Sequence, residues 1–389
     1  MNKAIKQLMK TQSILIQKKN KIRKDLYNGI FNRYHDPVLT SDHVPVNWRF
    51  DLDETTNPYG IERLGVNAVF NSGAILFNNT YYLVVRLEGT DRKSIFALAK
   101  SHTGIDQFQF VRPVIFDRLD QETNLYDMRL TLHEDGFIYG VFCSESLDPK
   151  NPQSMDAIAA AGIVRTKDLV TWERLPNLVT KSPQQRNCIL HPEFYNQQYL
   201  MYTRPQDGFI EVGKAGGVSA GLIKDMTNPI IDQETLIDQR IYHTIYETKN
   251  GGGAVPIKTN QGWIHIAHGV RNTAAGLRYV LYTFATDLAN PFKLIAKPSG
   301  YFMAPIENER IGDVSNVLFA NGAIEKDGII YLYYASSDTR LHVATMKKDA
   351  LIDYVFNNPP EKFNTFDATQ QRIELIEKNM KKEEFHHEK

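Results

Sequence analysis

One pattern of apolar and polar residues recurs five times along the chain. Each copy has an apolar strand, a short polar turn and a second strand rich in aromatic residues. The copies read GAILFNNTYYLVVR (73–86), LTLHEDGFIYGVF (130–142), HPEFYNQQYLMYTR (191–204), IKTNQGWIHIAHGV (257–270) and GAIEKDGIIYLYYA (322–335). Ring-bearing residues mark matching points 57 to 66 residues apart, at Tyr82, Tyr139, Tyr199, His265 and Tyr331. A period of this kind predicts a repeat architecture.

A further strand pattern follows each copy, as in SIFALAKS after the first and RLHVATMKKD after the last. Five such units predict an all-β fold, a five-bladed β-propeller with N- and C-terminal helices. We expect residues 30–350 to form the propeller and catalytic domain, with helical extensions at 1–29 and 351–389. The inner strands of a propeller line a central funnel, so polar residues at their ends are the candidates for function.

The terminal segments have helical periodicity. An apolar stripe among lysines predicts a helix near the N-terminus, through Ile5, Leu8, Met9 and Leu15. A similar stripe near the C-terminus contains Ile373, Ile376 and Met380. These helices either pack on the body of the protein or form a contact between subunits, and the second interpretation predicts a homo-oligomer.

Composition narrows the function classes. Lys+Arg and Asp+Glu are both 45 in 389 residues, so no global field attracts nucleic acid or an anionic membrane. The two cysteines, Cys143 and Cys188, are not paired as CxxC, which argues against a disulfide framework and a zinc site. The chain has no secretory signal pattern and no apolar run near the ~20 residues that span a bilayer. We therefore expect a cytoplasmic protein. We also expect no metal site, because no Cys/His spacing typical of metal ligands occurs.

The segment NLYDMRLTLHEDGFIYG (124–140) predicts a β-hairpin that turns at HEDG. Alternation puts an apolar set on one face, Tyr126, Met128, Leu130 and Leu132, and a polar set on the other, Asp127, Arg129 and Thr131. We expect the apolar set to pack a blade. Asp127 and Arg129 are either an exposed ion pair worth under about 1 kcal/mol, or part of a site in which Arg129 sets the charge or orientation of Asp127.

Four basic residues fall at or just beyond the inner-strand ends of successive units: Arg186, Arg204, Lys249 and His268. A propeller brings them together as one positive site inside a neutral protein. Arginine offers a fork to phosphate oxygens and lysine adds a point charge, so phosphate is the natural ligand. Taken singly, each arginine is also compatible with a structural ion pair, and His268 with a core histidine.

Several longer motifs resemble those of glycoside hydrolase family 130. They include NPYGIERLGVNAVFNSGAI, VRLEGTDRKS, YDMRLTLHEDGFIYG, QQRNCILHPEF, HIAHGVRNTAAGLRYVLY, GYFMAPIENERIGDVSNVLF and YYASSDTR. The resemblance covers about residues 30–350 and implies a five-bladed propeller, in agreement with the repeat count. Within the family, the likeness is strongest to the enzymes that use phosphate to cleave 4-O-β-D-mannosyl-D-glucose. The implied products are α-D-mannose 1-phosphate and D-glucose, with inversion at the anomeric carbon.

The resemblance also implies residue roles. Asp127 is the general acid, which acts through the mannosyl 3-hydroxyl. The implied phosphate ligands are Arg186, Asn187, Arg204, Lys249, His268 and Tyr279, and the implied mannosyl ligands are Asn67, Arg86, Tyr126 and Asp338. Phosphate is a co-substrate, and no cofactor is expected. A phosphorylase needs one catalytic acid and a basic cluster, because phosphate replaces the water that a hydrolase activates with a second carboxylate.

Three alternatives stay open from the sequence. One is a β-1,4-mannooligosaccharide phosphorylase on the same scaffold. Another is a β-mannoside hydrolase with Asp313 or Asp338 as the base, which the retained basic cluster argues against. The third is a carbohydrate-binding propeller without catalytic activity.

Overall fold

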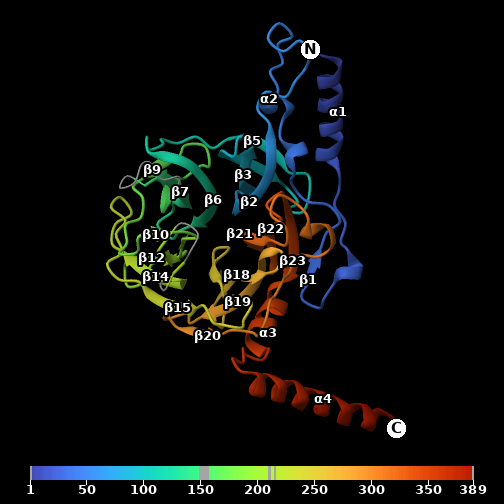
Figure 1. Cartoon of the computed structure of the whole chain (residues 1–389), viewed down its shortest axis with the longest axis vertical. Coiled ribbons are helices and arrows are strands. Elements are labelled where there is room, and N and C mark those ends of the chain that lie inside the picture. The colour runs from blue at the N-terminus through green and yellow to red at the C-terminus, as the bar shows by residue number, and fades with distance from the viewer. Residues whose placement is uncertain (1, 149–156, 209–211, 214–215, 388–389) are drawn as a thin grey trace.

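The computed structural model describes residues 2–148, 157–208, 212–213 and 216–387. Five antiparallel sheets of four or five strands surround a central axis (Figure 1). This arrangement confirms the predicted five-bladed β-propeller with terminal helices. The first strand of a blade lies nearest the axis, since β2 packs against both β6 and β21.

The blades follow one another along the chain, and each is an up-and-down sheet. Blade 1 contains β2 (Val66–Phe77), β3 (Thr80–Gly89), β4 (Ser94–Ser101) and β5 (Gln109–Pro113). Blade 2 contains β6 (Glu122–Leu132), β7 (Ile138–Leu147), β8 (Ala157–Thr166) and β9 (Glu173–Leu175). Blade 3 contains β11 (Ile189–Leu190), β12 (Tyr199–Thr203), β14 (Gly217–Ile223) and β15 (Thr235–Gln239), beside the short pair β10 (Gln184–Gln185) and β13 (Pro205–Gln206).

The last two blades complete the ring. Blade 4 contains β16 (Lys249–Gly252), β17 (Ile257–Lys258), β18 (Trp263–Thr273), β19 (Gly276–Thr286) and β20 (Leu294–Ala296). Blade 5 contains β21 (Leu318–Lys326), β22 (Ile329–Ser336), β23 (Arg340–Lys347) and, from the start of the chain, β1 (Phe31–Arg33).

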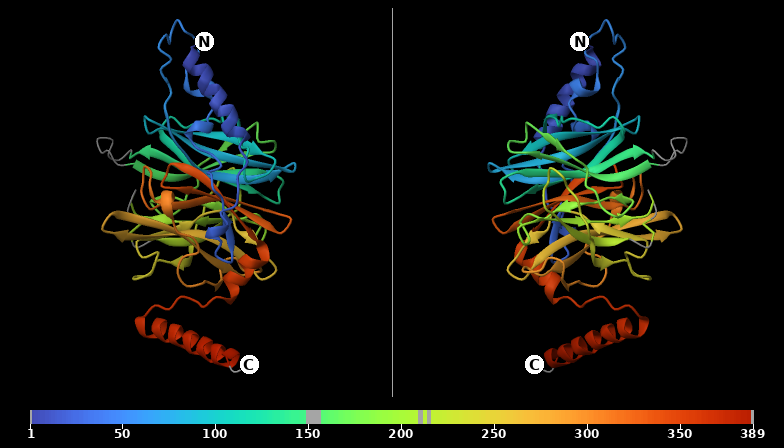
Figure 2. Two further views of the ribbon diagram at one scale, coloured as in Figure 1. Left: turned by 90° about the vertical axis from the view of Figure 1, so that its right-hand side faces the viewer. Right: turned by 90° about the vertical axis from the view of Figure 1, so that its left-hand side faces the viewer.

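The helices lie outside the blades. They are α1 (Lys3–Gln17), α2 (Val46–Arg49), α3 (Lys348–Asn357) and α4 (Thr365–His387), with short 3-10 turns η1 (Lys24–Leu26), η2 (Ser41–His43) and η3 (Glu307–Arg310). Helix α3 buries Leu351 and Val355 in the core shared by blades 4 and 5. Helices α1 and α4 project from opposite ends of the molecule (Figure 2). Within the described ranges, no helix is long and apolar enough to cross a membrane. The domain limits at residues 29/30 and 350/351 stay a prediction.

The hydrophobic core is divided among the gaps between neighbouring blades. Between blades 1 and 2, for example, Phe96 and Leu98 of β4 pack with Met128 of β6 and Phe142 of β7. Burial of each such side chain stabilises the fold by about 1.5–3 kcal/mol. Because each core joins two blades, neighbouring blades hold each other in place. The side chains at the inner ends of the blades are fixed in the same way.

The innermost strand of blade 2 departs from the predicted alternation. The hairpin and its turn are as expected, and Gly136 supplies a φ of +85° in the turn. Leu132, however, is 53% exposed, so its prediction as a packing residue is wrong. A β-bulge between Tyr126 and Arg129 interrupts the alternation, and neighbouring blades cover both faces of the strand. Arg129 is therefore buried like its apolar neighbours.

Strand β1 closes the ring by pairing with β23, so that Phe31 lies opposite Met346. Arg33 of β1 is buried and forms an ion pair with Glu309. It also donates to the carbonyl oxygen of Ala304 at 2.8 Å and to the hydroxyl of Tyr334 at 3.3 Å. The first strand of the chain thus fixes both the last blade and the loop that precedes it.

We expect Arg33→Met to lower the free energy of unfolding by about 3 kcal/mol, because removing one partner of a buried ion pair leaves the other charge uncompensated. Lys18→Met is the matched control. Lys18 also pairs with a carboxylate, that of Asp36 at 2.7 Å, but its side chain is 55% exposed, so its loss costs less than about 1 kcal/mol. Urea unfolding followed by circular dichroism measures both, and equal losses would contradict the role of Arg33 in closure.

Candidate active site

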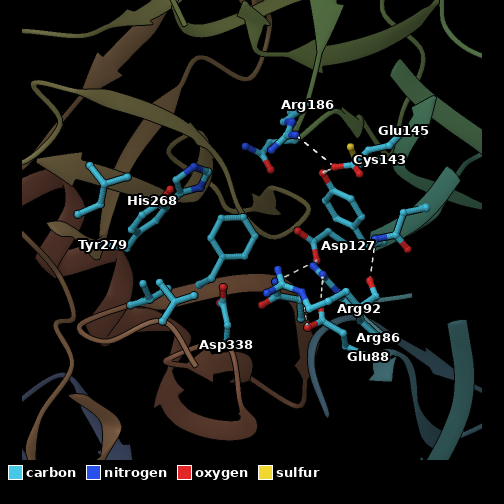
Figure 3. A pocket seen from close by; sticks show the side chains of 18 of the residues that line it. Arg86, Glu88, Arg92, Asp127, Cys143, Glu145, Arg186, His268, Tyr279 and Asp338 are labelled. Carbon is cyan, nitrogen blue, oxygen red and sulfur yellow. Dashed lines mark hydrogen bonds and ion pairs between the residues drawn. The ribbon is translucent and has the colours of Figure 1, made fainter. Parts of the chain in front are cut away.

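A cavity of about 540 Å³ lies where the five blades meet (Figure 3). Every blade contributes to its lining: Arg86 from blade 1, Asp127 from blade 2, Arg204 from blade 3, His268 from blade 4 and Asp338 from blade 5. A funnel at the centre of a propeller is therefore the place where the predicted residues converge.

All but one of the residues predicted for the site line this cavity. They are Arg86, Tyr126, Asp127, Arg186, Asn187, Arg204, Lys249, His268, Tyr279 and Asp338. The exception is Asn67, which does not belong to the lining and instead donates a hydrogen bond to the Asp313 carboxylate. Four residues further along β2, Asn71 lines the cavity.

Sequence reasoning missed Asn71, which contacts the predicted acid directly. Asn71 has a φ of +45° at a bulge in β2, and its Nδ2 donates to Oδ1 of Asp127 at 2.9 Å. Asparagine tolerates the left-handed region better than most residues. The available signal was a second asparagine within the same inner strand, four residues after Asn67.

Asp127 also lies on a bulge, with a φ of +61°. This conformation turns its side chain out of the strand alternation and into the cavity (Figure 3). Asn71 and Arg86 both donate to the same oxygen, Oδ1, the arginine from Nη1 at 3.2 Å. Among the described residues, no protein donor reaches Oδ2. That oxygen is the one that can carry a proton toward a substrate.

Arg86 is held rigidly beside Asp127. Its guanidinium lies between two aromatic rings, with Cζ 4.4 Å from the ring centre of Phe70 and 4.5 Å from that of Tyr126. Nη2 donates to Glu88 at 2.6 Å. Burial acts to lower the pKa of Arg86, but the carboxylates of Asp127 and Glu88 outweigh it, and the pKa is raised. Arg86 is therefore a permanent cation at the sugar side of the predicted site.

Two buried bases, Arg204 and His268, also line the cavity. Burial, reinforced by Arg186, lowers the pKa of Arg204 to about 10, so it stays charged at neutral pH. Burial and the neighbouring Arg204, Arg129 and Lys249 lower the pKa of His268 well below its usual value. His268 is thus a neutral imidazole, and neither ring nitrogen has a hydrogen-bond partner among the described residues. A neutral imidazole can donate one hydrogen bond to an oxyanion.

Three further residues that line the cavity are Arg186, Lys249 and Tyr279. Arg186 approaches Glu145, with Nη2 3.3 Å from Oε1. The ammonium of Lys249 lies 5.6 Å from the ring centre of Tyr279. Arg186, Arg204 and Lys249 carry three positive charges on one side of the cavity, and this is the charge pattern that binds a dianion such as phosphate.

Arg129 lies behind the cavity wall and is only 1% exposed. Its guanidinium donates to the backbone oxygens of Asp127 (3.0 Å), Gly252 (3.1 Å) and Gly253 (2.9 Å), and to Oδ1 of Asn187 (3.1 Å). It therefore orients Asp127 through the backbone, and none of its hydrogen bonds within the described part of the chain goes to the Asp127 carboxylate. The interpretation of Asp127 and Arg129 as an exposed ion pair is wrong, because Arg129 is buried.

Asp338 faces the cavity from the turn after β22, with a φ of +49°. Burial, and then the nearby charge of Asp127, raise the pKa of Asp338 to about 7. Below this pH it is a protonated acid that can donate a hydrogen bond to a sugar hydroxyl. The same protonation makes it a poor base for activating water.

The profile of glycoside hydrolase family 130, described as beta-1,4-mannooligosaccharide phosphorylase, matches residues 38–357. The chain is 53% identical, over 98% of both sequences, to the 4-O-beta-D-mannosyl-D-glucose phosphorylase of Bacteroides fragilis. It is 26% identical to the beta-1,4-mannooligosaccharide phosphorylase of Ruminococcus albus, over 81% of this chain and 92% of the relative.

A solved structure supports the fold. The beta-1,2-mannobiose phosphorylase from Listeria innocua superposes with a TM-score of 0.66 at 19% identity, covering 87% of this chain and 99% of the other.

We expect Asp338→Asn to change the pH dependence of stability. Because its pKa is raised, folded Asp338 keeps a proton between about pH 4 and 7 that the unfolded chain has lost. Its contribution to the free energy of unfolding therefore falls as pH rises through this range, by at most about 1.4 kcal/mol per pH unit. The asparagine variant loses that slope and is more stable than the wild type at pH 8.

Urea unfolding at pH 5, 6, 7 and 8 measures the slope. Asp225→Asn is the control, since the hydrogen bonds in its turn lower the pKa of Asp225 and it stays ionised across this range. Identical slopes for the wild type and Asp338→Asn would contradict the prediction.

Proposed function

Because the chain belongs to glycoside hydrolase family 130, we propose that it catalyses the inverting phosphorolysis of 4-O-β-D-mannosyl-D-glucose. Phosphate is the second substrate, and the products are α-D-mannose 1-phosphate and D-glucose. The 53% identity to a phosphorylase of this specificity supports the substrate. The observation that carries the chemistry is the position of Asp127 and a three-charge basic cluster on the lining of one cavity.

In this proposal, phosphate is held by the basic wall. Arg204 and Arg186 provide forked donors, Lys249 a point charge, and His268 a neutral N–H donor. Asn187 and Tyr279 complete the set of phosphate ligands. Fixing the dianion beside the anomeric carbon replaces the activation of water by a base. An attack from the side opposite the leaving glucose inverts the anomeric centre.

Asp127 supplies the proton for the leaving group. Its Oδ2 donates to the mannosyl 3-hydroxyl, which passes its own proton to the glycosidic oxygen as the bond from C1 to that oxygen breaks. A bond between C1 and a phosphate oxygen forms at the same carbon. The proton that hydrogen phosphate brought in then restores Asp127, so no base, metal or cofactor is required. Arg86 and Asn71 hold the ionised form through Oδ1 in the meantime.

Arg86, Tyr126 and Asp338 bind the mannosyl unit in this scheme, because they lie on the Asp127 side of the cavity. Asn67 acts from outside the lining, through its contact with Asp313. A hydrolase would need Asp338 or Asp313 as an ionised base beside the scissile bond. The raised pKa of Asp338 and the positive charges of Arg186, Arg204 and Lys249 in the same cavity favour phosphate as the nucleophile.

A second candidate differs only in the acceptor. The family profile is described as beta-1,4-mannooligosaccharide phosphorylase. A mannooligosaccharide would extend beyond the glucose position toward the rim of the cavity. Reverse synthesis from α-D-mannose 1-phosphate with glucose, mannose and short mannooligosaccharides as acceptors distinguishes the two activities.

The proposal includes a homo-oligomer formed through the terminal helices. Helix α4 extends away from the propeller and exposes large apolar side chains, among them Phe366 at 79%, with Ile376 and Met380 along the same helix. Apolar residues in such number on one projecting helix favour burial against a second copy of the chain. A cytoplasmic location is also proposed, because Cys143 and Cys188 are free and buried thiols, which suit a reducing compartment.

The reaction predicts an absolute requirement for phosphate. The wild-type protein should release glucose from mannosyl-glucose only with phosphate, and NMR should identify the α-anomer of mannose 1-phosphate. Asp127→Asn should lose about 10³-fold in kcat, within the usual range for a general acid, and keep its phosphate affinity. Asp287→Asn, in an outer turn of blade 4, is the control with unchanged rates. Equal glucose release with and without phosphate would identify a hydrolase instead.

The oligomer is tested by sedimentation velocity of the full chain, whose monomer is 44.5 kDa. We expect the wild type to sediment as an oligomer, and Phe366→Asp/Ile376→Asp as a monomer, because charges cannot be buried in an apolar contact. Leu132→Asp replaces another exposed apolar residue, in blade 2, and should leave the oligomer intact. A monomeric wild type would disprove the proposed assembly.

A further inference from the structure

Glu145 is a mostly buried carboxylate between the two sides of the cavity. It lies near the end of β7, opposite Asn124 of β6 and Ala159 of β8. A single oxygen, Oε1, accepts a hydrogen bond from the Tyr126 hydroxyl and another from Nη2 of Arg186 at 3.3 Å. Figure 3 shows the contact between Glu145 and Arg186. Glu145 therefore joins a residue of the sugar side to a residue of the phosphate side.

The ring of Tyr126 continues this link toward the acid. Cζ of Arg86 lies 4.5 Å from its centre, and Cζ of Arg186 lies 5.9 Å from it. Arg86 in turn forms the ion pair with Asp127. A continuous chain of contacts thus runs from Arg186, through Glu145, Tyr126 and Arg86, to the general acid.

The charge of Glu145 is unexpected at this place. A carboxylate beside Arg186 repels the phosphate dianion that Arg186, Arg204 and Lys249 attract, so it weakens binding. A carboxylate that only filled space could be an uncharged glutamine. Its benefit must therefore lie in geometry, because a charge-assisted hydrogen bond fixes a long arginine side chain more firmly than a neutral one.

We propose that Glu145 is a positioning residue for the phosphorolysis, an inference that rests on the function proposed above. Before phosphate binds, Glu145 is the counter-ion of Arg186 and keeps its guanidinium extended toward the cavity. After phosphate binds, Glu145 holds one edge of the guanidinium while phosphate takes the other. The same oxygen keeps Tyr126 in place, so that phosphate and the mannosyl unit bind in mutual register. Phosphate affinity is lowered as a result, and the rate of the bound complex is raised.

Two variants separate the charge of Glu145 from its geometry. Glu145→Gln removes the repelling charge, and phosphate should bind about fivefold more tightly. The contact between residue 145 and Arg186 is then no longer charge-assisted and holds the guanidinium less firmly, so kcat should fall about tenfold. Glu145→Asp keeps the charge but is too short to reach both partners. Its phosphate affinity should stay within about twofold of the wild type, while its kcat should fall about tenfold, as in Glu145→Gln. Isothermal titration with inorganic phosphate and steady-state kinetics measure the two quantities.

Glu173→Gln is the matched control. Glu173 also pairs with an arginine of blade 2, Arg165 at 2.7 Å, but it is 56% exposed and outside the cavity lining, so neither quantity should change. Phosphate affinity in Glu145→Gln that is unchanged or weaker overturns the proposal, as does an unchanged kcat in either variant. If Glu145→Gln gives no cooperative unfolding transition, the kcat of Glu145→Asp decides. Glucose release by the wild type without phosphate would refute the proposed function, whereas the titrations would still test the effect of the Glu145 charge.

Discussion

The site depends on the burial of one guanidinium, that of Arg129. Removing such a charge from water costs several kcal/mol unless its donors are satisfied. Here they are satisfied by acceptors from three segments: the backbone of Asp127, the side chain of Asn187, and the carbonyls of Gly252 and Gly253. Because the cost is offset only when all three segments are present, Arg129 holds the proposed general acid, a proposed phosphate ligand and the strand of Lys249 at fixed separations.

Close approach and backbone strain follow from this arrangement. A Cβ atom on Gly253 would lie 2.4 Å from the carbonyl oxygen of Ile266, so the glycines of 251–253 allow strands to meet at the axis. Asp127, Asn187 and Asp338 all have positive φ and all line the cavity. Each such conformation costs on the order of 1 kcal/mol or more. The cores between the blades supply the stability that keeps these side chains aimed into the cavity.

The fold could be predicted from the sequence more completely than the detailed contacts of the site. A hydrophobic repeat reports which strands are buried, so five units and their spacing were enough for the propeller. Basic residue types at matching points of the repeat were enough to predict that Arg204 and His268 line one cavity. Asn71 and Glu145 could not be found in this way, because a bulge or a cross-strand contact depends on the register of two strands. For the same reason the alternation failed at Leu132, and it could not decide whether Arg129 forms an exposed ion pair or orients Asp127.

Ring closure by β1 has a consequence for how the chain is made. A ribosome releases β1 first, yet its partner β23 is synthesised more than 300 residues later, after every other strand. Blades 1 to 4 can form in order of their appearance, whereas blade 5 must wait for the end of translation. Each of the five blades contributes to the cavity, so a nascent chain holds the acid and the basic cluster in separate, unfinished parts. Activity therefore begins only after the ring closes, and a truncated translation product cannot cleave the disaccharide.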